Sequence, residues 1–222
     1  ALIQALKGQG QRPKAIVFVP YVTSVMTWVD ECKKHTPGLV CVPLVSDTSS
    51  NHQVCQATEG DLFVICYQSA VAMLADRQGK KWRLPTQHVR DTFADFNILV
   101  MDEVHKCKDV TSLTYRMCLT ISKQSEYALG LTGTPFGSDL QDLWPQFNLI
   151  DFGATLGPTM GFYREVFFRK KQNFWGGYEY DFRKKLLPEL KRIIKNCSIH
   201  YSIDELLDLP PKEYVVRSIR VP

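Results

Sequence analysis

Short runs of apolar residues recur along the chain, and each is followed by a polar turn and a segment with helical spacing. The runs contain few polar interruptions, which is typical of strands buried on both faces of a parallel sheet. Alternating strands and helices predict an α/β fold, with a parallel sheet covered on both faces by helices. Residues 77–84 are expected to form a charged loop. The predicted strands cover residues 14–20, 39–45, 61–67, 97–102 and 127–132.

The pattern changes after Trp144. Glycines interrupt the sequence, aromatic residues become frequent, and we expect helices rather than strands. We interpret the aromatic residues as the core of a small subdomain rather than a base-stacking surface, because stacking proteins present aromatic side chains on strands. The predicted organisation is an α/β lobe over 1–150, a helical protrusion over 151–208, and a returning strand with an exit segment over 209–222.

The most informative stretch is Asn-Ile-Leu-Val-Met-Asp-Glu-Val-His, at residues 97–105. Its apolar strand ends directly in two carboxylates, Asp102 and Glu103, at the edge where parallel sheets bind ligands. Neighbouring side chains on a strand point to opposite sides, so the two acids can have separate tasks. Asp102 can hold a magnesium ion through its waters, while Glu103 orients and polarises an attacking water. This arrangement predicts nucleotide hydrolysis; the alternative is a core strand followed by a solvated acidic turn.

A second signature, Leu-Gly-Leu-Thr-Gly-Thr-Pro, covers residues 129–135. Together, Asp-Glu-Val-His and Leu-Thr-Gly-Thr-Pro resemble motifs II and III of superfamily 2 helicase-like ATPases. The chain departs from one subgroup pattern at Gly137 and Ser138, where Gln-Asn is usual. Four further features narrow the resemblance to the Swi/Snf (sucrose-non-fermenting) group of double-stranded DNA translocases: Lys108, Ser112, the segment 139–144, and Leu-Pro-Pro-Lys at 209–212.

The resemblance implies a RecA-like lobe, ATP and Mg²⁺ as cofactors, and a second RecA-like lobe in the same parent chain. Asp102 would bind Mg²⁺ through water, Glu103 would activate the attacking water, and His105 completes the catalytic motif. A coupling role, which links the nucleotide state to loops that face DNA, is implied for His105 together with Thr132, Gly133 and Thr134.

The resemblance also implies contacts with double-stranded DNA from motif Ia, after the first strand, and from motif Ib, after the third. The alternative at motif Ia is an ordinary turn between strand and helix, with a helix cap at Thr23. Trp28, in the helix after motif Ia, is interpreted as a packing residue and not a DNA contact. The candidate DNA contacts in these two loops are Pro20, Tyr21, Thr23, Ser24, Tyr67 and Ser69.

No phosphate-binding loop of the form Gly-x-x-x-x-Gly-Lys-Ser/Thr occurs in the 222 residues. By the resemblance, residues 1–7 end the helix that such a loop precedes. We therefore expect the first motor lobe of an ATP-dependent translocase, inactive alone because the second lobe supplies the arginine that stabilises the transferring phosphoryl group. The alternatives are a motor lobe of a restriction or repair helicase and a non-catalytic nucleic-acid-binding module. A Gly-Lys-Thr directly upstream would favour a motor over the module.

Charge adds one further candidate surface. The net charge of +4 is modest, yet residues 161–195 contain ten basic and four acidic residues, a local excess of six. Such an excess is consistent with a surface that faces phosphates, with Lys184 and Lys185 as candidate DNA contacts. A solvated helix face gives the same pattern.

Seven cysteines without any Cys-x-x-Cys pair argue against a disulfide framework and a zinc site. No apolar run approaches the roughly twenty residues that a membrane-spanning helix needs, and no secretory leader is recognisable. We therefore expect an intracellular protein without a membrane partner, located in the cytoplasm or nucleoid of a bacterium or phage-infected cell, or in a nucleus.

Overall fold

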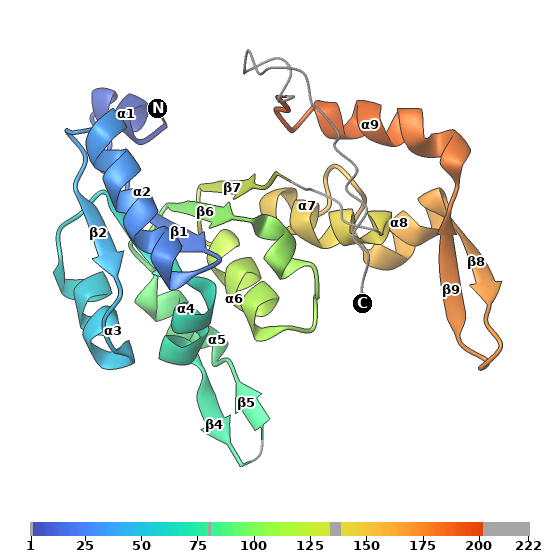
Figure 1. Ribbon diagram of the computed structural model, residues 1–222, viewed down its shortest axis with the longest axis horizontal. Coiled ribbons are helices and arrows are strands. Elements are labelled where there is room, and N and C mark those ends of the chain that lie inside the picture. The colour runs from blue at the N-terminus through green and yellow to red at the C-terminus, as the bar shows by residue number, and fades with distance from the viewer. Residues whose placement is uncertain (1, 80, 134–138, 202–222) are drawn as a thin grey trace, which may run out of the picture. The chain divides into compact units, whose positions relative to one another are not determined.

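The computed structural model describes residues 2–79, 81–133 and 139–201, and the chain forms two compact units, Ala1–Arg183 and Lys184–Pro222. Within its described residues, the first unit contains a five-stranded parallel sheet and two small antiparallel hairpins (Figure 1). The second unit contains η3 (Lys184–Leu186) and α9 (Leu187–Lys195). No helix among the described residues is long and apolar enough to cross a membrane.

The strands of the first unit are β1 (Ala15–Val19), β2 (Cys41–Leu44), β3 (Leu62–Cys66), β4 (Asp76–Gln78), β5 (Lys81–Arg83), β6 (Ile98–Asp102), β7 (Tyr127–Leu131), β8 (Phe168–Gln172) and β9 (Tyr178–Phe182). Its helices are α1 (Leu2–Gly8), α2 (Val22–His35), α3 (Thr48–Ala57), α4 (Tyr67–Leu74), α5 (Thr86–Thr92), η1 (Val104–Cys107), α6 (Leu113–Ser122), η2 (Leu140–Asp142), α7 (Leu143–Asp151) and α8 (Met160–Phe167).

The large sheet has the strand order β2-β3-β1-β6-β7, and every neighbouring pair is parallel. All five strands predicted from the apolar runs are present. In the central strand, Ile16 pairs with Phe63 of β3 on one side and with Leu99 of β6 on the other. Because the strands run the same way, their carboxyl ends meet at one edge, where Asp102 of β6 pairs with Leu131 of β7. The two predicted motifs therefore leave adjacent strands side by side.

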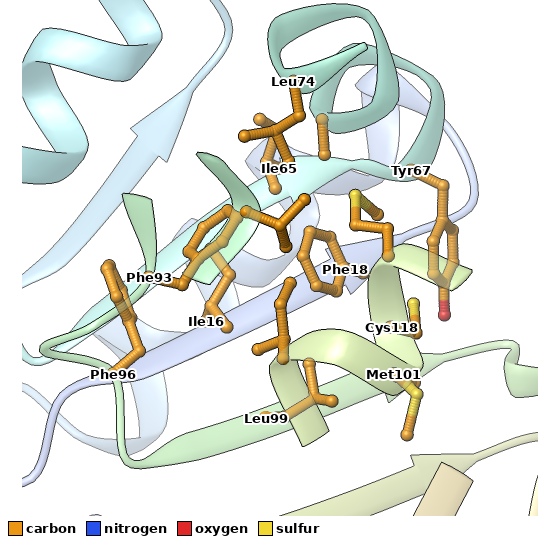
Figure 2. Close-up of a cluster of buried hydrophobic side chains, with 14 of the residues drawn as sticks. Ile16, Phe18, Ile65, Tyr67, Leu74, Phe93, Phe96, Leu99, Met101 and Cys118 are labelled. Carbon is orange, nitrogen blue, oxygen red and sulfur yellow. The ribbon is translucent and has the colours of Figure 1, made fainter. Parts of the chain in front are cut away.

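Side chains of the central strand alternate between two buried layers, as the strand period requires. Ile16 and Phe18 face a cluster with residues of α3, α4, α5, α6 and α7, whereas Val17 faces residues of α1 and α2. Figure 2 shows the first cluster, in which the Phe18 ring lies 5.7 Å from the Tyr67 ring and 6.1 Å from the Phe93 ring. Burial on both faces explains the continuous apolar runs and confirms the predicted α/β fold.

A hairpin replaces the charged loop expected at residues 77–84. Strands β4 and β5 pair there, with Arg77 opposite Trp82. Gly79 lies in the connecting turn with a φ of +63°, a left-handed conformation that glycine adopts without a steric penalty. Every residue of the two strands is exposed, so no apolar face marked them in the sequence.

The helical protrusion expected over 151–208 is only partly helical. It contains α8 and α9, but β8 and β9 form a hairpin between them, with Phe168 opposite Phe182. The sequence Tyr-Glu-Tyr-Asp-Phe at 178–182 alternates aromatic and acidic residues, which is strand periodicity next to a glycine-rich turn. The returning strand expected at 209–222 lies outside the described residues.

The hairpin of β8 and β9 belongs to the first compact unit, which ends at Arg183. Tyr163, on α8, is fully buried, and its ring lies 5.4 Å from that of Phe168, so these aromatic residues form a core as expected. Phe174 and Trp175, at the hairpin turn, are 92% and 86% exposed and do not belong to that core.

Replacing Phe18 by alanine should reduce the free energy of unfolding by about 3–5 kcal/mol, because a fully buried ring leaves a cavity in the cluster between the sheet and its helices. Urea denaturation followed by circular dichroism measures the change. Phe174→Ala is the matched control and should leave the unfolding midpoint almost unchanged, since that ring is exposed. Equal midpoints for the two variants would contradict the assignment of the core.

Candidate active site

Strand β6 ends at Asp102, and the chain then turns through Glu103 into η1. Glu103 has a left-handed backbone, with φ 51° and ψ 54°. For a residue with a side chain this region costs roughly 1–2 kcal/mol. Such strain is commonly retained at functional sites. The sharp turn allows the Glu103 carboxylate to meet the residue that follows β7.

Glu103, His105 and Thr132 form one hydrogen-bonded cluster. The Thr132 hydroxyl donates to Oε2 of Glu103 at 3.1 Å, and His105 Nδ1 lies 3.1 Å from the same oxygen and 3.2 Å from Thr132 Oγ1. The side chains of His105 and Glu103 are 33% and 38% exposed, so the cluster is open to a ligand. Three residues of two separate motifs thus lie together, and their coupling role stays a prediction. Gly133 is exposed, and Thr134 lies outside the described residues.

Asp102 is held by two side chains from distant parts of the chain. The indole Nε1 of Trp28 donates to Asp102 Oδ2 at 2.9 Å, and the Tyr67 hydroxyl donates to the Asp102 carbonyl oxygen at 3.0 Å. Trp28, expected only to pack, therefore has a specific partner in the acidic motif, which lies 74 positions away in sequence. Burial raises the pKa of the Tyr67 hydroxyl well above its ordinary value, so this group keeps its proton and remains a donor.

The acidic residues suit magnesium better than a metal that needs a full set of protein ligands. Among the described residues, no three His, Cys, Asp or Glu side chains gather as a metal site. Mg²⁺ keeps several waters and commonly takes one or two carboxylates together with substrate phosphates. With Oδ2 of Asp102 engaged by Trp28, the other carboxylate oxygen, Oδ1, is the atom that would hold a magnesium-bound water.

The loop of motif Ia follows the carboxyl end of β1. Tyr21 is 61% exposed and is the N-cap of α2, so Thr23 is an exposed residue of the first turn and the alternative of a cap at Thr23 is wrong. The Lys106 ammonium of η1 lies 5.5 Å from the centre of the Tyr21 ring. Pro20 and Ser24 are half-buried. The loop is therefore accessible, and one of its side chains contacts the segment that follows the acidic motif.

Motif Ib differs from the expectation. Tyr67 is only 3% exposed, and its hydroxyl is already bonded to the acidic motif, so the geometry does not support the DNA contact expected from this side chain. Ser69 is half-buried. Gln68, between them, is the residue that the start of α4 exposes, and the sequence pattern gave no reason to single it out.

The basic stretch over 161–195 is less available than its charge suggests. Lys184 and Lys185 are exposed and belong to the second compact unit, so they stay candidates for DNA contact. A cation whose charge lies over an aromatic ring or against a carboxylate has less attraction left for a phosphate. Three of the ten basic side chains have such partners: Arg164 with the Tyr180 ring, Lys170 with the Tyr178 ring, and Arg192 with Glu189.

Comparison with protein families and known relatives identifies the family of the chain. The profile of the SNF2-related domain matches residues 1–221. Protein p41 of Acyrthosiphon pisum secondary endosymbiont phage 1 is 25% identical over 174 residues, which are 75% of this chain and 35% of p41. Helicase SWR1 of Candida albicans is 32% identical over 134 residues, which are 58% of this chain and 7% of SWR1. The chain is similar to only a minor part of these longer relatives.

A solved structure shows the same fold. The SWI2/SNF2 ATPase core of Sulfolobus solfataricus, in complex with double-stranded DNA, matches with a TM-score of 0.61 and 20% sequence identity. The match covers 94% of this chain and 38% of that chain. It identifies the parallel sheet described above as RecA-like.

Proposed function

The chain belongs to the SNF2-related domain family, and we propose that it is the first motor lobe of an ATP-dependent translocase that acts on double-stranded DNA. The observation that carries the proposal is the cluster of Glu103, His105 and Thr132, next in sequence to Asp102 at the carboxyl edge of the sheet. Together these residues would provide one carboxylate for a metal ion, a second carboxylate for the attacking water, and a hydrogen-bonded link to the neighbouring strand. The Sulfolobus structure, which contains double-stranded DNA, supports the choice of partner.

Each side chain of the cluster would have a distinct task. Bound ATP with Mg²⁺ would supply the phosphoryl group and neutralise its developing charge. Asp102 would hold a metal-bound water through Oδ1. Glu103 would orient the attacking water and accept its proton as a general base. His105 and Thr132 contact Oε2 of Glu103, which leaves Oε1 for that water.

Hydrolysis would require parts beyond these 222 residues. An arginine of a second RecA-like lobe would stabilise the transferring phosphoryl group. The backbone amides of a Gly-x-x-x-x-Gly-Lys-Ser/Thr loop, which the sequence lacks, would provide most of the phosphate recognition. ATP hydrolysis is therefore proposed for a longer parent chain, working in an intracellular compartment that contains DNA, either a nucleoid or a nucleus.

Two alternatives differ in how well they explain Glu103. A motor lobe of a restriction or repair helicase would share this acidic site and differ elsewhere in the parent chain. A non-catalytic nucleic-acid-binding module would need no carboxylate at this position. Glycine or asparagine adopts left-handed backbone at a lower cost than glutamate, so the strained Glu103 favours a catalytic role.

Glu103→Gln, in a longer chain that includes the phosphate loop and the second lobe, should lower kcat on the order of 10²-fold or more. The substitution removes the general base and leaves the phosphate contacts in place, so nucleotide affinity should change little. A steady-state ATPase assay and a nucleotide-binding titration measure the two effects. Glu126→Gln, an exposed carboxylate next to the amino end of β7, is the matched control. A Glu103→Gln variant with parental kcat would contradict the assignment.

The 222-residue chain by itself should neither hydrolyse ATP nor bind it tightly, because the loop that recognises phosphates and the second lobe are both needed. Phosphate release and isothermal titration calorimetry with ATP and Mg²⁺ are the measurements. Turnover above background that disappears in Glu103→Gln would show that this chain is sufficient for catalysis.

Duplex binding by this chain should be indifferent to sequence and steeply dependent on salt, because the candidate contacts face phosphates and not base edges. If about four phosphates are contacted, the log-log salt slope should be about −3 to −4. Reversing the charge of Lys184 and Lys185 should flatten the slope by up to roughly two units, whereas Thr23→Ala should weaken binding at an almost unchanged slope.

The control for this titration is charge reversal at Lys33 and Lys34, which are exposed in the last turn of α2. They lie 11 and 12 residues after Val22, about 17 Å along the helix from its motif Ia end at a rise of about 1.5 Å per residue. If both charge reversals change the salt slope equally, the effect at Lys184 and Lys185 comes from the net charge of the protein and not from a direct phosphate contact.

A further inference from the structure

Two side chains from two different predicted DNA-facing segments converge on Asp102. Trp28 lies on α2, the helix that follows motif Ia, and its indole nitrogen donates to the Asp102 carboxylate. Tyr67 is the first residue of α4, at motif Ib, and its hydroxyl donates to the Asp102 carbonyl. The two bonds hold both the side chain and the main chain of the residue that would bind magnesium.

The Trp28 bond fixes one oxygen of the Asp102 carboxylate that would hold the metal-bound water. An indole has one N–H and no acceptor, so this bond has a fixed direction. It engages Oδ2 at 2.9 Å and holds the plane of the carboxylate. A hydrogen bond from a neighbouring side chain commonly orients a metal-binding group in this way, and its loss typically costs 10- to 100-fold in metal affinity or activity.

The Tyr67 bond acts on the peptide that precedes the strained residue. The Asp102 carbonyl belongs to the peptide unit joining Asp102 to Glu103, whose backbone is left-handed. The Tyr67 side chain is held tightly against the core, because it is 3% exposed and its ring stacks on Phe18 at 5.7 Å (Figure 2), so its hydroxyl would move only together with α4.

Both donors are attached to surfaces where DNA would bind. Trp28 is six residues after Val22, the first residue of α2, which is about 9 Å along the helix from the exposed loop with Tyr21. Tyr67 is followed directly by the exposed Gln68. A helix over such a distance moves as one body, so a displacement of either loop reaches Asp102 through a single hydrogen bond.

We propose that Trp28 and Tyr67 are positioning residues that transmit DNA engagement at motifs Ia and Ib to the magnesium-binding carboxylate of Asp102. The proposal rests on the function proposed above. The first link between the DNA-facing loops and the acidic motif would run through His105 and Thr132, which join that motif to the loop after β7. Trp28 and Tyr67 would add a second link. In this route DNA controls hydrolysis through the orientation of the carboxylate that would hold the metal-bound water.

The first test uses the 222-residue chain and needs no ATPase activity. The indole N–H signals of its four tryptophans are followed by ¹⁵N NMR. Asp102→Ala should move the Trp28 signal upfield and speed its exchange with solvent, while the Trp144 signal stays in place. Trp144 is the internal control, because its indole also donates one bond, to the Gly157 carbonyl at 2.9 Å. An unchanged Trp28 signal would overturn the proposed contact.

The same signals test coupling to DNA. Saturating duplex should shift the Trp28 signal and leave that of Trp144 unchanged. If duplex binds and both signals stay in place, or both shift equally, the route through Trp28 is wrong although the proposed function stands. If no duplex binds, and the longer chain hydrolyses no ATP, the proposed function fails and this inference fails with it.

The second test uses the longer chain with the phosphate loop and second lobe. Trp28→Phe keeps a ring and removes the N–H, and should raise the Mg²⁺ concentration at half-maximal rate on the order of 10-fold. It should also lower the ratio of DNA-stimulated to basal kcat. Tyr67→Phe should lower the same ratio, with a smaller effect on the Mg²⁺ requirement, since its bond is to the main chain.

Two matched variants separate positioning from general loss of packing. Trp144→Phe removes an indole bond to the Gly157 carbonyl, and Tyr163→Phe removes a buried hydroxyl bond to the Leu140 carbonyl at 2.9 Å. Neither residue contacts Asp102. Both variants should keep the parental Mg²⁺ dependence and DNA stimulation. The same changes in the controls as in Trp28→Phe and Tyr67→Phe would overturn the proposal.

Discussion

The parallel register of β6 and β7 is the constraint on which the candidate active site depends. It sets Asp102 level with the last residue of β7, so the loops that follow the two strands begin at the same height. Only then can Thr132 reach the Glu103 carboxylate. Gly130 of β7 permits close packing here, because a Cβ at this position would lie 3.2 Å from Val104 Cγ1 in η1. A register shift of one residue would turn the side chains of β7 to the opposite face.

The strain at Glu103 depends on its surroundings. The left-handed backbone of Glu103 costs energy. Two hydrogen bonds stabilise the turn: Tyr67 donates to the preceding carbonyl, and Thr132 donates to the Glu103 side chain. Tyr67 begins α4 directly after β3, which is separated from β6 by β1, whereas Thr132 follows the neighbouring strand β7. The turn at Glu103 therefore depends on the assembled lobe, which joins the stability of the fold to the geometry of the candidate site.

The sequence revealed the sheet well because burial on both faces leaves strands as unbroken apolar runs, and it revealed the acidic motif because carboxylates follow such a run directly. The hairpin of β4 and β5 could not be predicted in this way, because its exposed strands carry no apolar face. The bond from Trp28 to Asp102 could not be predicted from the sequence, for a different reason. A tryptophan at a helical position suits packing equally well, and the partner of a side chain 74 residues away is set by the tertiary fold alone.

Net charge is a weak guide to the proposed DNA-binding surface of this lobe. In the hairpin of β8 and β9, the strand register sets Arg169 opposite Asp181 and Lys171 opposite Glu179. With three cations and two acids, the hairpin therefore contributes only one of the six positive charges in excess over residues 161–195. The loop at Tyr21 has few charges, yet it joins an exposed position to the acidic motif through α2. In the proposed motor, where DNA binding would have to alter catalysis, that mechanical connection would matter more than the strength of attraction to DNA.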